Sequence, residues 1–181
     1  MLLDREQAVL AVIDIQQVLL PKDAAVAEAY LANAAKMIRA ARVTGVPVLV
    51  TEQYPERLGG TVDRIAAEIG GLPRIAKREF GCMANEDFRN ALIALGRRQL
   101  LIVGMEAHIC VSQTALAALA EGYEVFAAAD ALSSASEKEY RFGIDRMARA
   151  GVSVLSVQMA VFELLRVSGT PEFKTLLPLL K

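Results

Sequence analysis

The sequence is poor in the residues that several common site types require. Its 181 residues include one histidine and two cysteines. Two cysteines are too few for a disulfide framework, and one histidine with two cysteines argues against a structural zinc site. We therefore expect free thiols, no metal and a cytoplasmic protein.

The sequence also lacks an excess of charge of one sign and any long apolar run. Lysine and arginine number 20 and aspartate and glutamate 21, which leaves a net charge of −1. A chain so close to neutral has no electrostatic attraction for nucleic acid or an anionic membrane. Asp4, Arg5 and Glu6 interrupt the first apolar stretch, and no uncharged run reaches the ~18 residues of a membrane span. We expect no secretory leader, no membrane and no nucleic acid as partner.

Phosphate-binding loops are absent as well. No G-x-G-x-x-G follows the first strand expected, and the sequence contains no G-x-x-x-x-G-K-[ST], so neither a dinucleotide nor a nucleoside triphosphate is expected as cofactor. The G-x-S-x-G elbow of serine hydrolases is missing too. The sequence therefore predicts no cofactor.

What is present is a regular alternation of short β-branched runs and Ala-rich helical stretches. We expect strands at 8–15, 46–51, 74–77, 99–104, 123–129 and 152–157. Helices are expected at 23–44, 63–69, 85–95, 110–121 and 137–150, with two more at the end and a loop at 52–61. This alternation predicts one α/β domain over residues 1–181, with a three-layer α/β/α, Rossmann-like fold. Its six-stranded parallel sheet has the expected order 3-2-1-4-5-6.

Three reactive side chains follow strands near the expected switch point of this sheet, where ligands of such folds bind. Asp14 ends the first strand, and a carboxylate at the end of an apolar run needs a partner if it is buried. Lys77 ends the third strand. Cys110 opens the helix after the fourth strand, where free amides favour a thiolate and Lys77 could lower the thiol pKa. Each also has an ordinary interpretation: a loop-capping aspartate, a surface lysine and a small buried cysteine.

The remaining polar candidates are less specific. Gln16 follows Asp14 by two residues and is expected on the same side. Cys82 lies in a loop without a helix start directly behind it, so we interpret it as a non-catalytic thiol. His108 is too close in sequence to Cys110 to form a well-aligned Cys–His dyad, and we expect it in the pocket wall or in solvent.

Asp14, Lys77 and Cys110, together with the segment GMEAHICV at 104–111, resemble the isochorismatase-like cysteine hydrolases. The likeness extends from Val9 to about Lys181 and is most specific in GMEAHICVSQTALAALAEGYEVFAAADALSS. The TEQYP stretch at 51–55 and the K-x-x-F pattern at 77–80 are most similar to the isochorismatase domain-containing branch of this family.

The resemblance implies a catalytic triad. Asp14 would take the proton of the Cys110 thiol and later give it to the leaving group, while Lys77 would orient Asp14 and stabilise the thiolate. Cys110 would attack a carbonyl carbon and form a thioester that water hydrolyses. The resemblance also implies a cis peptide bond at Met105–Glu106. This bond would turn the amide of Glu106 toward that of Cys110, giving an oxyanion hole with two donors.

The chain departs from the nicotinamidases of this family, which have an Asp/His metal cluster after the second strand. Here residues 51–54 read TEQY, without histidine, which leaves a pocket that holds no metal. A small, largely uncharged amide would suit such a pocket. Its expected substrate-binding residues are Gln16, Gln53, Tyr54, Phe80 and Ile109.

The leading hypothesis is a metal-independent cysteine hydrolase, an amidohydrolase that cleaves a C–N bond of a small molecule. The alternative is a catalytically silent binding or interaction protein with the same fold. In either case the apolar composition and the Ala-rich helices suit a homo-oligomer, a dimer or tetramer. A third hypothesis is a redox role for Cys110 with Cys82, although the sequence has no C-x-x-C motif.

Overall fold

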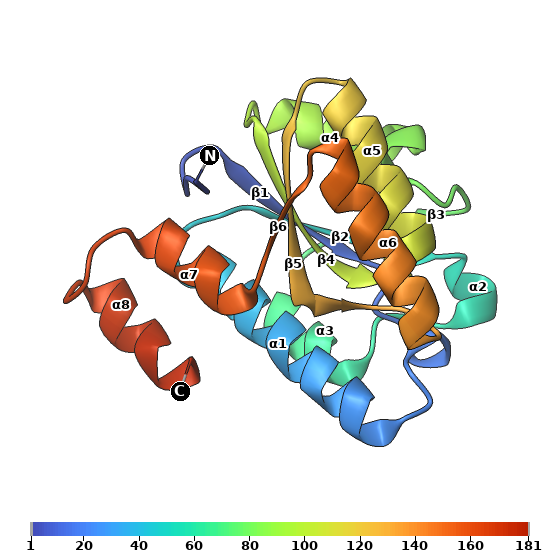
Figure 1. Cartoon of the computed structure of the whole chain (residues 1–181), viewed down its shortest axis with the longest axis horizontal. Coiled ribbons are helices and arrows are strands. Elements are labelled where there is room, and N and C mark those ends of the chain that lie inside the picture. The colour runs from blue at the N-terminus through green and yellow to red at the C-terminus, as the bar shows by residue number, and fades with distance from the viewer. Residues whose placement is uncertain (1, 181) are drawn as a thin grey trace.

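The computed structural model describes residues 2–180, and its core is a six-stranded, all-parallel sheet (Figure 1). The strand order β3-β2-β1-β4-β5-β6 confirms the fold class and the topology predicted from the sequence. The strands are β1 Ala8–Ile13, β2 Val48–Gln53, β3 Arg74–Lys77, β4 Gln99–Met105, β5 Glu124–Ser133 and β6 Ser153–Leu155. The order reverses between the neighbouring strands β1 and β4, so the crevice expected to bind ligands lies at their carboxyl ends.

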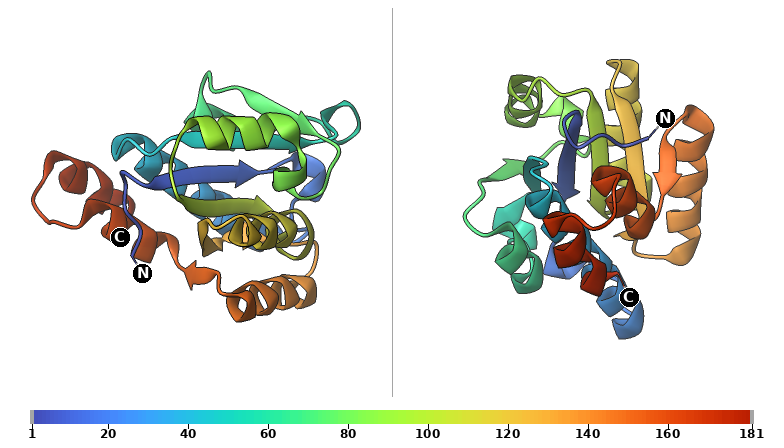
Figure 2. Two further views of the ribbon diagram at one scale, coloured as in Figure 1. Left: turned by 90° about the horizontal axis from the view of Figure 1, so that it is seen from above. Right: turned by 90° about the vertical axis from the view of Figure 1, so that its left-hand side faces the viewer.

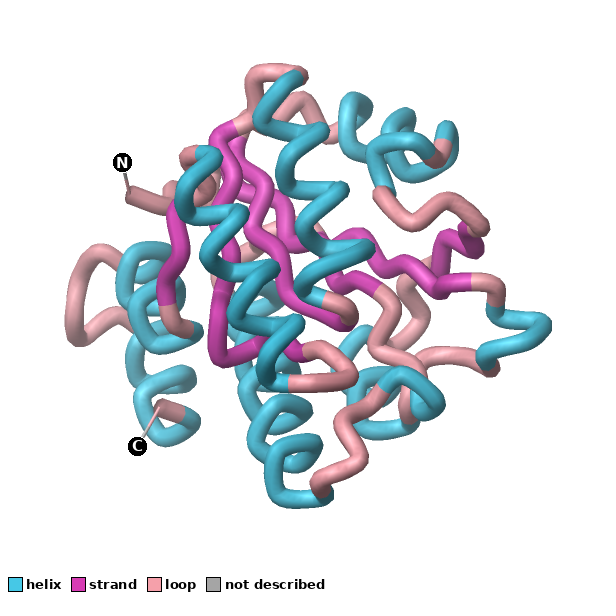
Figure 3. Tube along the Cα trace, turned by 45° about the vertical axis from the view of Figure 1, so that its right-hand side comes forward, coloured by secondary structure: helices cyan, strands magenta, loops and turns pink. Residues whose placement is uncertain are grey.

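Helices cover both faces of the sheet (Figures 1 and 2). On one side lie α1, α3 and α7, and on the other α4, α5 and α6, the layer that comes forward in Figure 3. Their bounds are α1 Ala24–Val43, α2 Pro55–Leu58, α3 Asp63–Ile69, α4 Glu86–Ala94, α5 Ser112–Ala120, α6 Glu137–Ala150, α7 Val157–Leu165 and α8 Pro171–Leu176. None of the helices within residues 2–180 combines the length and apolarity needed to cross a membrane.

Strand β1 explains why the sheet needs both layers. All six of its residues are buried, and they alternate between two hydrophobic clusters. Leu10 and Val12 pack with the α1 side, whereas Val9, Ala11 and Ile13 pack with the α4–α6 side. A strand apolar on both faces is stable only between two helical layers.

Several element ends differ from the sequence prediction. Strand β1 stops at Ile13 because Asp14 takes a left-handed conformation, with φ of 52°. Strand β2 continues to Gln53 because its last residues pair with β3, and the loop expected at 52–61 contains α2. Strand β5 runs on to Ser133, since a bulge allows its last residues to pair again with the end of β4.

The connection from β4 to α5 also differs from the expected helix start at Cys110. A five-residue π-helical turn, Ala107–Val111, precedes α5, so Cys110 lies inside this turn. We call Ala107–Val111 the nucleophile turn, after the role that the sequence analysis expects of Cys110. Helix α6 packs directly against it at Gly143, where a Cβ atom would come within 2.7 Å of the Ala107 carbonyl carbon.

Gly143→Ala should therefore destabilise the protein by about 1–3 kcal/mol, the usual cost of overpacking, because backbone cannot yield as a flexible side chain does. Gly71→Ala is the matched control, since Gly71 has no atom within 4 Å of its Cβ position. Its expected change stays within about 0.5 kcal/mol. Urea denaturation followed by circular dichroism measures both. Equal stability of the two variants would contradict the close contact between α6 and the nucleophile turn.

Candidate active site

Three strand ends bring Asp14, Lys77 and Cys110 to one edge of the sheet. Lys77 is the last residue of β3, and its Nζ lies 2.6 Å from Asp14 Oδ2, directly after β1. Both side chains are fully buried. Strand β2 lies between β1 and β3, so the ammonium group crosses two strand spacings of about 4.8 Å each. The long, unbranched stem of lysine makes this contact possible.

Four oxygen atoms surround the Lys77 ammonium group. Besides Asp14, they are Gln53 Oε1 at 2.6 Å and the carbonyl oxygens of Glu79 and Phe80, both at 3.1 Å. A buried cation is tolerated only when protein groups replace its hydration shell in this way. The ammonium group is therefore held in one position, and it fixes the carboxylate that it contacts.

The second oxygen of the Asp14 carboxylate is held by Thr51, a residue that the sequence analysis missed. Thr51 Oγ1 donates a hydrogen bond of 2.7 Å to Asp14 Oδ1, and the Asp14 N–H donates to the Thr51 carbonyl at 3.2 Å. The parallel register pairs Ile13 with Thr51, so knowledge of that register would have placed Thr51 beside Asp14. With both oxygens engaged, the orientation of the carboxylate is set.

Cys110 is the third residue at this edge of the sheet. Its side chain is a neutral thiol rather than the expected thiolate. Burial, the charge of Asp14 and a hydrogen bond to Asp14 raise the pKa of the Cys110 thiol to about 12, although Lys77 acts in the other direction. The expectation of a lowered pKa is therefore wrong. It fails because Asp14 offsets the charge of Lys77 at the sulfur, and because Cys110 is only 4% exposed. At neutral pH the thiol keeps its proton, beside a carboxylate able to accept it.

The nucleophile turn also corrects the expected cis peptide bond. Residues 2–180 contain no cis peptide bond, so Met105–Glu106 is trans. The chain reverses instead through Glu106, which has φ of 50° and ψ of 76°, followed by the π-helical turn. The N–H groups of Ile109 and Val111, on either side of Cys110, both donate to the Glu106 carbonyl, at 2.9 and 3.2 Å.

Two of the expected substrate-binding residues contact protein groups. Gln16 Nε2 donates to the carbonyls of Gln53 and Gly59 at 3.0 and 2.5 Å, and Gln16 Oε1 accepts from the Gln53 N–H at 2.7 Å. Gln53 itself binds Lys77 through Oε1 and the Arg78 carbonyl through Nε2. Both amides thus connect loops around the triad.

The other three expected substrate-binding residues, Tyr54, Phe80 and Ile109, have different surroundings. The Arg78 guanidinium group lies 4.1 Å from the centre of the Tyr54 ring, a cation–π contact. Phe80 is 56% exposed, and Ile109 is half-buried against the core on the α4–α6 side. Phe80 therefore has the free surface that a ligand contact requires.

The second cysteine and the histidine lie close by but outside the triad. Cys82 is fully buried, its Sγ lies 3.9 Å from Thr51 Oγ1, and burial raises its pKa to about 11. His108 Nδ1 lies 3.1 Å from Ser134 Oγ and 3.2 Å from Glu106 Oε2. His108 therefore contacts neighbouring side chains, and its expected place in a pocket wall stays a prediction. In the part of the chain that the structure describes, no three His, Cys, Asp or Glu residues gather as a metal site.

Comparison with known proteins identifies the family. The Isochorismatase domain model matches residues 8–159. The chain is 36% identical over 149 residues to the secreted isochorismatase effector Isc1 of Phytophthora sojae, which covers 80% of this chain and 71% of that protein. It is 35% identical over 147 residues to isochorismatase domain-containing protein 1 of Salmo salar, covering 81% of this chain and 51% of that protein, so it spans about half the length of that relative. The chain belongs to the isochorismatase family.

Solved structures show the same architecture. MAR1 ribonuclease from Caenorhabditis elegans matches with a TM-score of 0.88 and 29% identity, over 99% of this chain and 92% of that chain. YcaC from Escherichia coli, described as an octameric hydrolase of unknown specificity, matches with a TM-score of 0.89 and 26% identity. The match covers 99% of this chain and 90% of that chain. YcaC from Pseudomonas aeruginosa, with hexane-2,5-diol and covalent acrylamide, matches with a TM-score of 0.88 and 25% identity. The match covers 98% of this chain and 91% of that chain. The fold is that of the isochorismatase-family hydrolases.

The buried ion pair leads to a stability prediction. Lys77→Met leaves Asp14 charged and buried without its partner, which should cost about 3–5 kcal/mol of unfolding free energy. Adding Asp14→Asn should recover part of this loss, because the unpaired charge is removed. The exposed Lys174 provides the control, and Lys174→Met should change stability by less than about 0.5 kcal/mol. Urea denaturation of wild type, Lys77→Met, Asp14→Asn, the double variant and Lys174→Met measures the coupling. Strictly additive single-variant effects would contradict a direct Lys77–Asp14 interaction.

Proposed function

We propose that the protein is a metal-independent cysteine hydrolase that cleaves the C–N bond of a small, largely uncharged amide. The observation that carries this proposal is Asp14, whose carboxylate is fixed by Lys77 and Thr51 and faces the protonated thiol of Cys110. A nucleophile beside an oriented base is the arrangement that covalent acyl transfer needs. The thiol supplies the nucleophile, so no metal-bound water is needed.

In the proposed reaction, the Cys110 sulfur attacks the carbonyl carbon as its proton passes to Asp14. The N–H group of Cys110 binds the developing oxyanion, a contribution usually worth about 10²–10³ in rate per donor. The Glu106 N–H is expected as a second donor only with a cis Met105–Glu106 bond, and this bond is trans. Asp14 then returns the proton to the leaving nitrogen, the C–N bond breaks, and a thioester remains. Water attacks the thioester with Asp14 as base, releasing the carboxylic acid and restoring the thiol.

Because the thiol pKa is raised to about 12, a free thiolate is scarce at neutral pH, and attack must be coupled to proton transfer. Lys77 acts in this scheme as a positioning residue for Asp14. The covalent acrylamide of the Pseudomonas aeruginosa neighbour supports a reactive nucleophile in this fold.

Two further proposals concern assembly and location. The octameric state described for the Escherichia coli neighbour, and exposed Phe142 and Phe162 here, support a homo-oligomer, whose size as a dimer or tetramer stays a prediction from the sequence. Two free thiols support a cytoplasmic location.

The ribonuclease name of one neighbour raises RNA as a substrate, but a net charge of −1 offers RNA no electrostatic attraction.

The nucleophile is tested by trapping the acyl-enzyme. We expect a panel of small amides to include substrates that add an acyl group to the wild-type chain, detected by intact mass and mapped to Cys110. Cys110→Ala should lose both the adduct and turnover, whereas Cys82→Ala should keep the adduct. Turnover that survives Cys110→Ala would refute the mechanism. If no amide in the panel is turned over or forms an adduct, the binding-protein alternative is favoured.

Asp14→Asn separates base catalysis from thiol acidity. Turnover should fall by about 10²–10⁴, the usual contribution of a general base. Alkylation of Cys110 by iodoacetamide at pH 8 should become faster, because the carboxylate that raises the thiol pKa is gone and Lys77 remains. Peptide mapping across a pH series measures this, and circular dichroism checks folding. Slower alkylation of a folded Asp14→Asn variant would show that the carboxylate does not hold the thiol protonated.

A further inference from the structure

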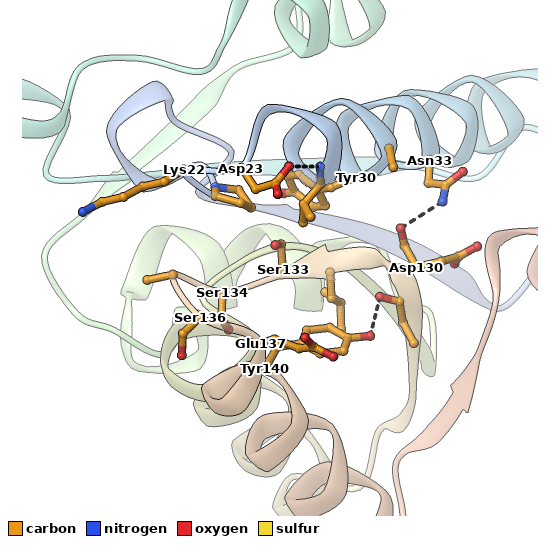
Figure 4. Close-up of a pocket in the computed structure, with 16 residues that line it drawn as sticks. Lys22, Asp23, Tyr30, Asn33, Asp130, Ser133, Ser134, Ser136, Glu137 and Tyr140 are labelled. Atoms are coloured by element: carbon orange, nitrogen blue, oxygen red, sulfur yellow. Dashed lines mark hydrogen bonds between the residues drawn. The ribbon is translucent and has the colours of Figure 1, made fainter.

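A second binding site is indicated by a cavity of about 580 Å³ between α1 and the β5–α6 connection (Figure 4). Its walls come from residues 21–33 on one side and residues 129–140 on the other, and neither Cys110 nor Lys77 lines it. This volume lies within the range of pockets that hold small molecules.

The wall is mainly apolar, and most of its polar groups already have protein partners. Asp23 caps α1 by accepting from the Ala25 and Val26 N–H groups. Asp130 Oδ1 accepts from the Val157 N–H at 2.7 Å, and the Tyr140 hydroxyl donates to the Ala129 carbonyl at 2.9 Å. The apolar members of the wall are Pro21, Val26, Ala29, Ala129, Leu132 and Ala135.

Two hydroxyl groups of the wall differ from the rest. Ser133, which Figure 4 shows on β5 facing α1, is only 6% exposed, and its hydroxyl makes no hydrogen bond to any residue between 2 and 180. Tyr30, across the cavity on α1, is 4% exposed, and its hydroxyl also has no hydrogen-bond partner among those residues. A buried polar group without a partner is rare, and the Tyr30 hydroxyl is such a group. The Ser133 hydroxyl is not among these fully buried atoms and belongs to the cavity wall, so a ligand can reach it.

The buried part of the cavity wall favours an uncharged ligand. The charged side chains among its lining residues, Lys22, Asp23, Asp130 and Glu137, belong to exposed residues, whereas Ser133 and Tyr30 offer neutral hydroxyls. Burial, Asp14 and Glu106 raise the Tyr30 pKa, so this hydroxyl stays neutral. We propose that this cavity binds an uncharged, largely apolar molecule with one hydroxyl or carbonyl group, which hydrogen-bonds the Ser133 hydroxyl. The proposal is independent of the triad chemistry.

Benzyl alcohol and toluene are matched probes, because they differ by one hydroxyl group alone. Titration followed by NMR spectra of the protein backbone amides should show saturable binding of both, with benzyl alcohol about fivefold tighter, the value of a modest hydrogen bond. The amide signals of Ala29, Leu132 and Ser134 should shift on binding, and those of Lys77 and Cys110 should shift less.

The variants then locate the site. Val26→Trp fills the cavity from an exposed position and should weaken both probes at least about tenfold, whereas Ile93→Trp, exposed on α4, should change neither. Ser133→Ala should remove the advantage of benzyl alcohol and leave toluene binding unchanged. A thermal melt verifies that each variant is folded.

Three results would overturn the proposal. They are absence of saturable binding up to the solubility limit, probe binding unchanged in Val26→Trp, and the largest shifts at Lys77 or Cys110. The last result would mean that the probes enter the triad pocket. If benzyl alcohol still binds folded Ser133→Ala more tightly than toluene does, the assigned hydrogen bond is contradicted.

Discussion

The ion pair between Lys77 and Asp14 is the constraint on which the carboxyl-terminal edge of the sheet depends. It links the edge strand β3 to the central strand β1 across β2, and β2 contributes Thr51 and Gln53 to the same network. Each charge alone would be costly at full burial, so the two are stable only together. The relative position of three strand ends is thereby fixed by electrostatics as well as by the backbone ladder.

This pair also determines what the thiol of Cys110 can do. A lysine alone would favour a thiolate, but Asp14 offsets its charge, and burial raises the thiol pKa further. Since the thiolate is the form that reacts with electrophiles and oxidants, the raised pKa lowers the reactivity of the resting thiol toward both. In the proposed mechanism, attack of the sulfur on a carbonyl carbon is therefore coupled to proton transfer to Asp14.

The sequence was sufficient to predict the strand order and to bring Asp14, Lys77 and Cys110 to one edge, because both follow from alternation and from which residues end the strands. It could not predict Thr51, whose role depends on strand register, or the direction of the thiol pKa, which depends on burial and on the balance of two charges. The interpretation of Gln16 as a pocket residue relied on its spacing from Asp14, and spacing does not show that its amide contacts Gln53 and Gly59.

The extension of β5 connects the cavity to the nucleophile turn, and local packing explains why it forms. Gly104 lies so close to β1 that a Cβ atom would meet the Ile13 carbonyl oxygen at 2.1 Å. At this point the register with β5 shifts, and Leu132 and Ser133 pair with the end of β4. The extension places Ser133 in the cavity wall, while the next residue contacts His108, two residues before Cys110. The close approach of the paired strands β1 and β4 at Gly104 therefore coincides with a segment of β5 that reaches both the cavity wall and the nucleophile turn.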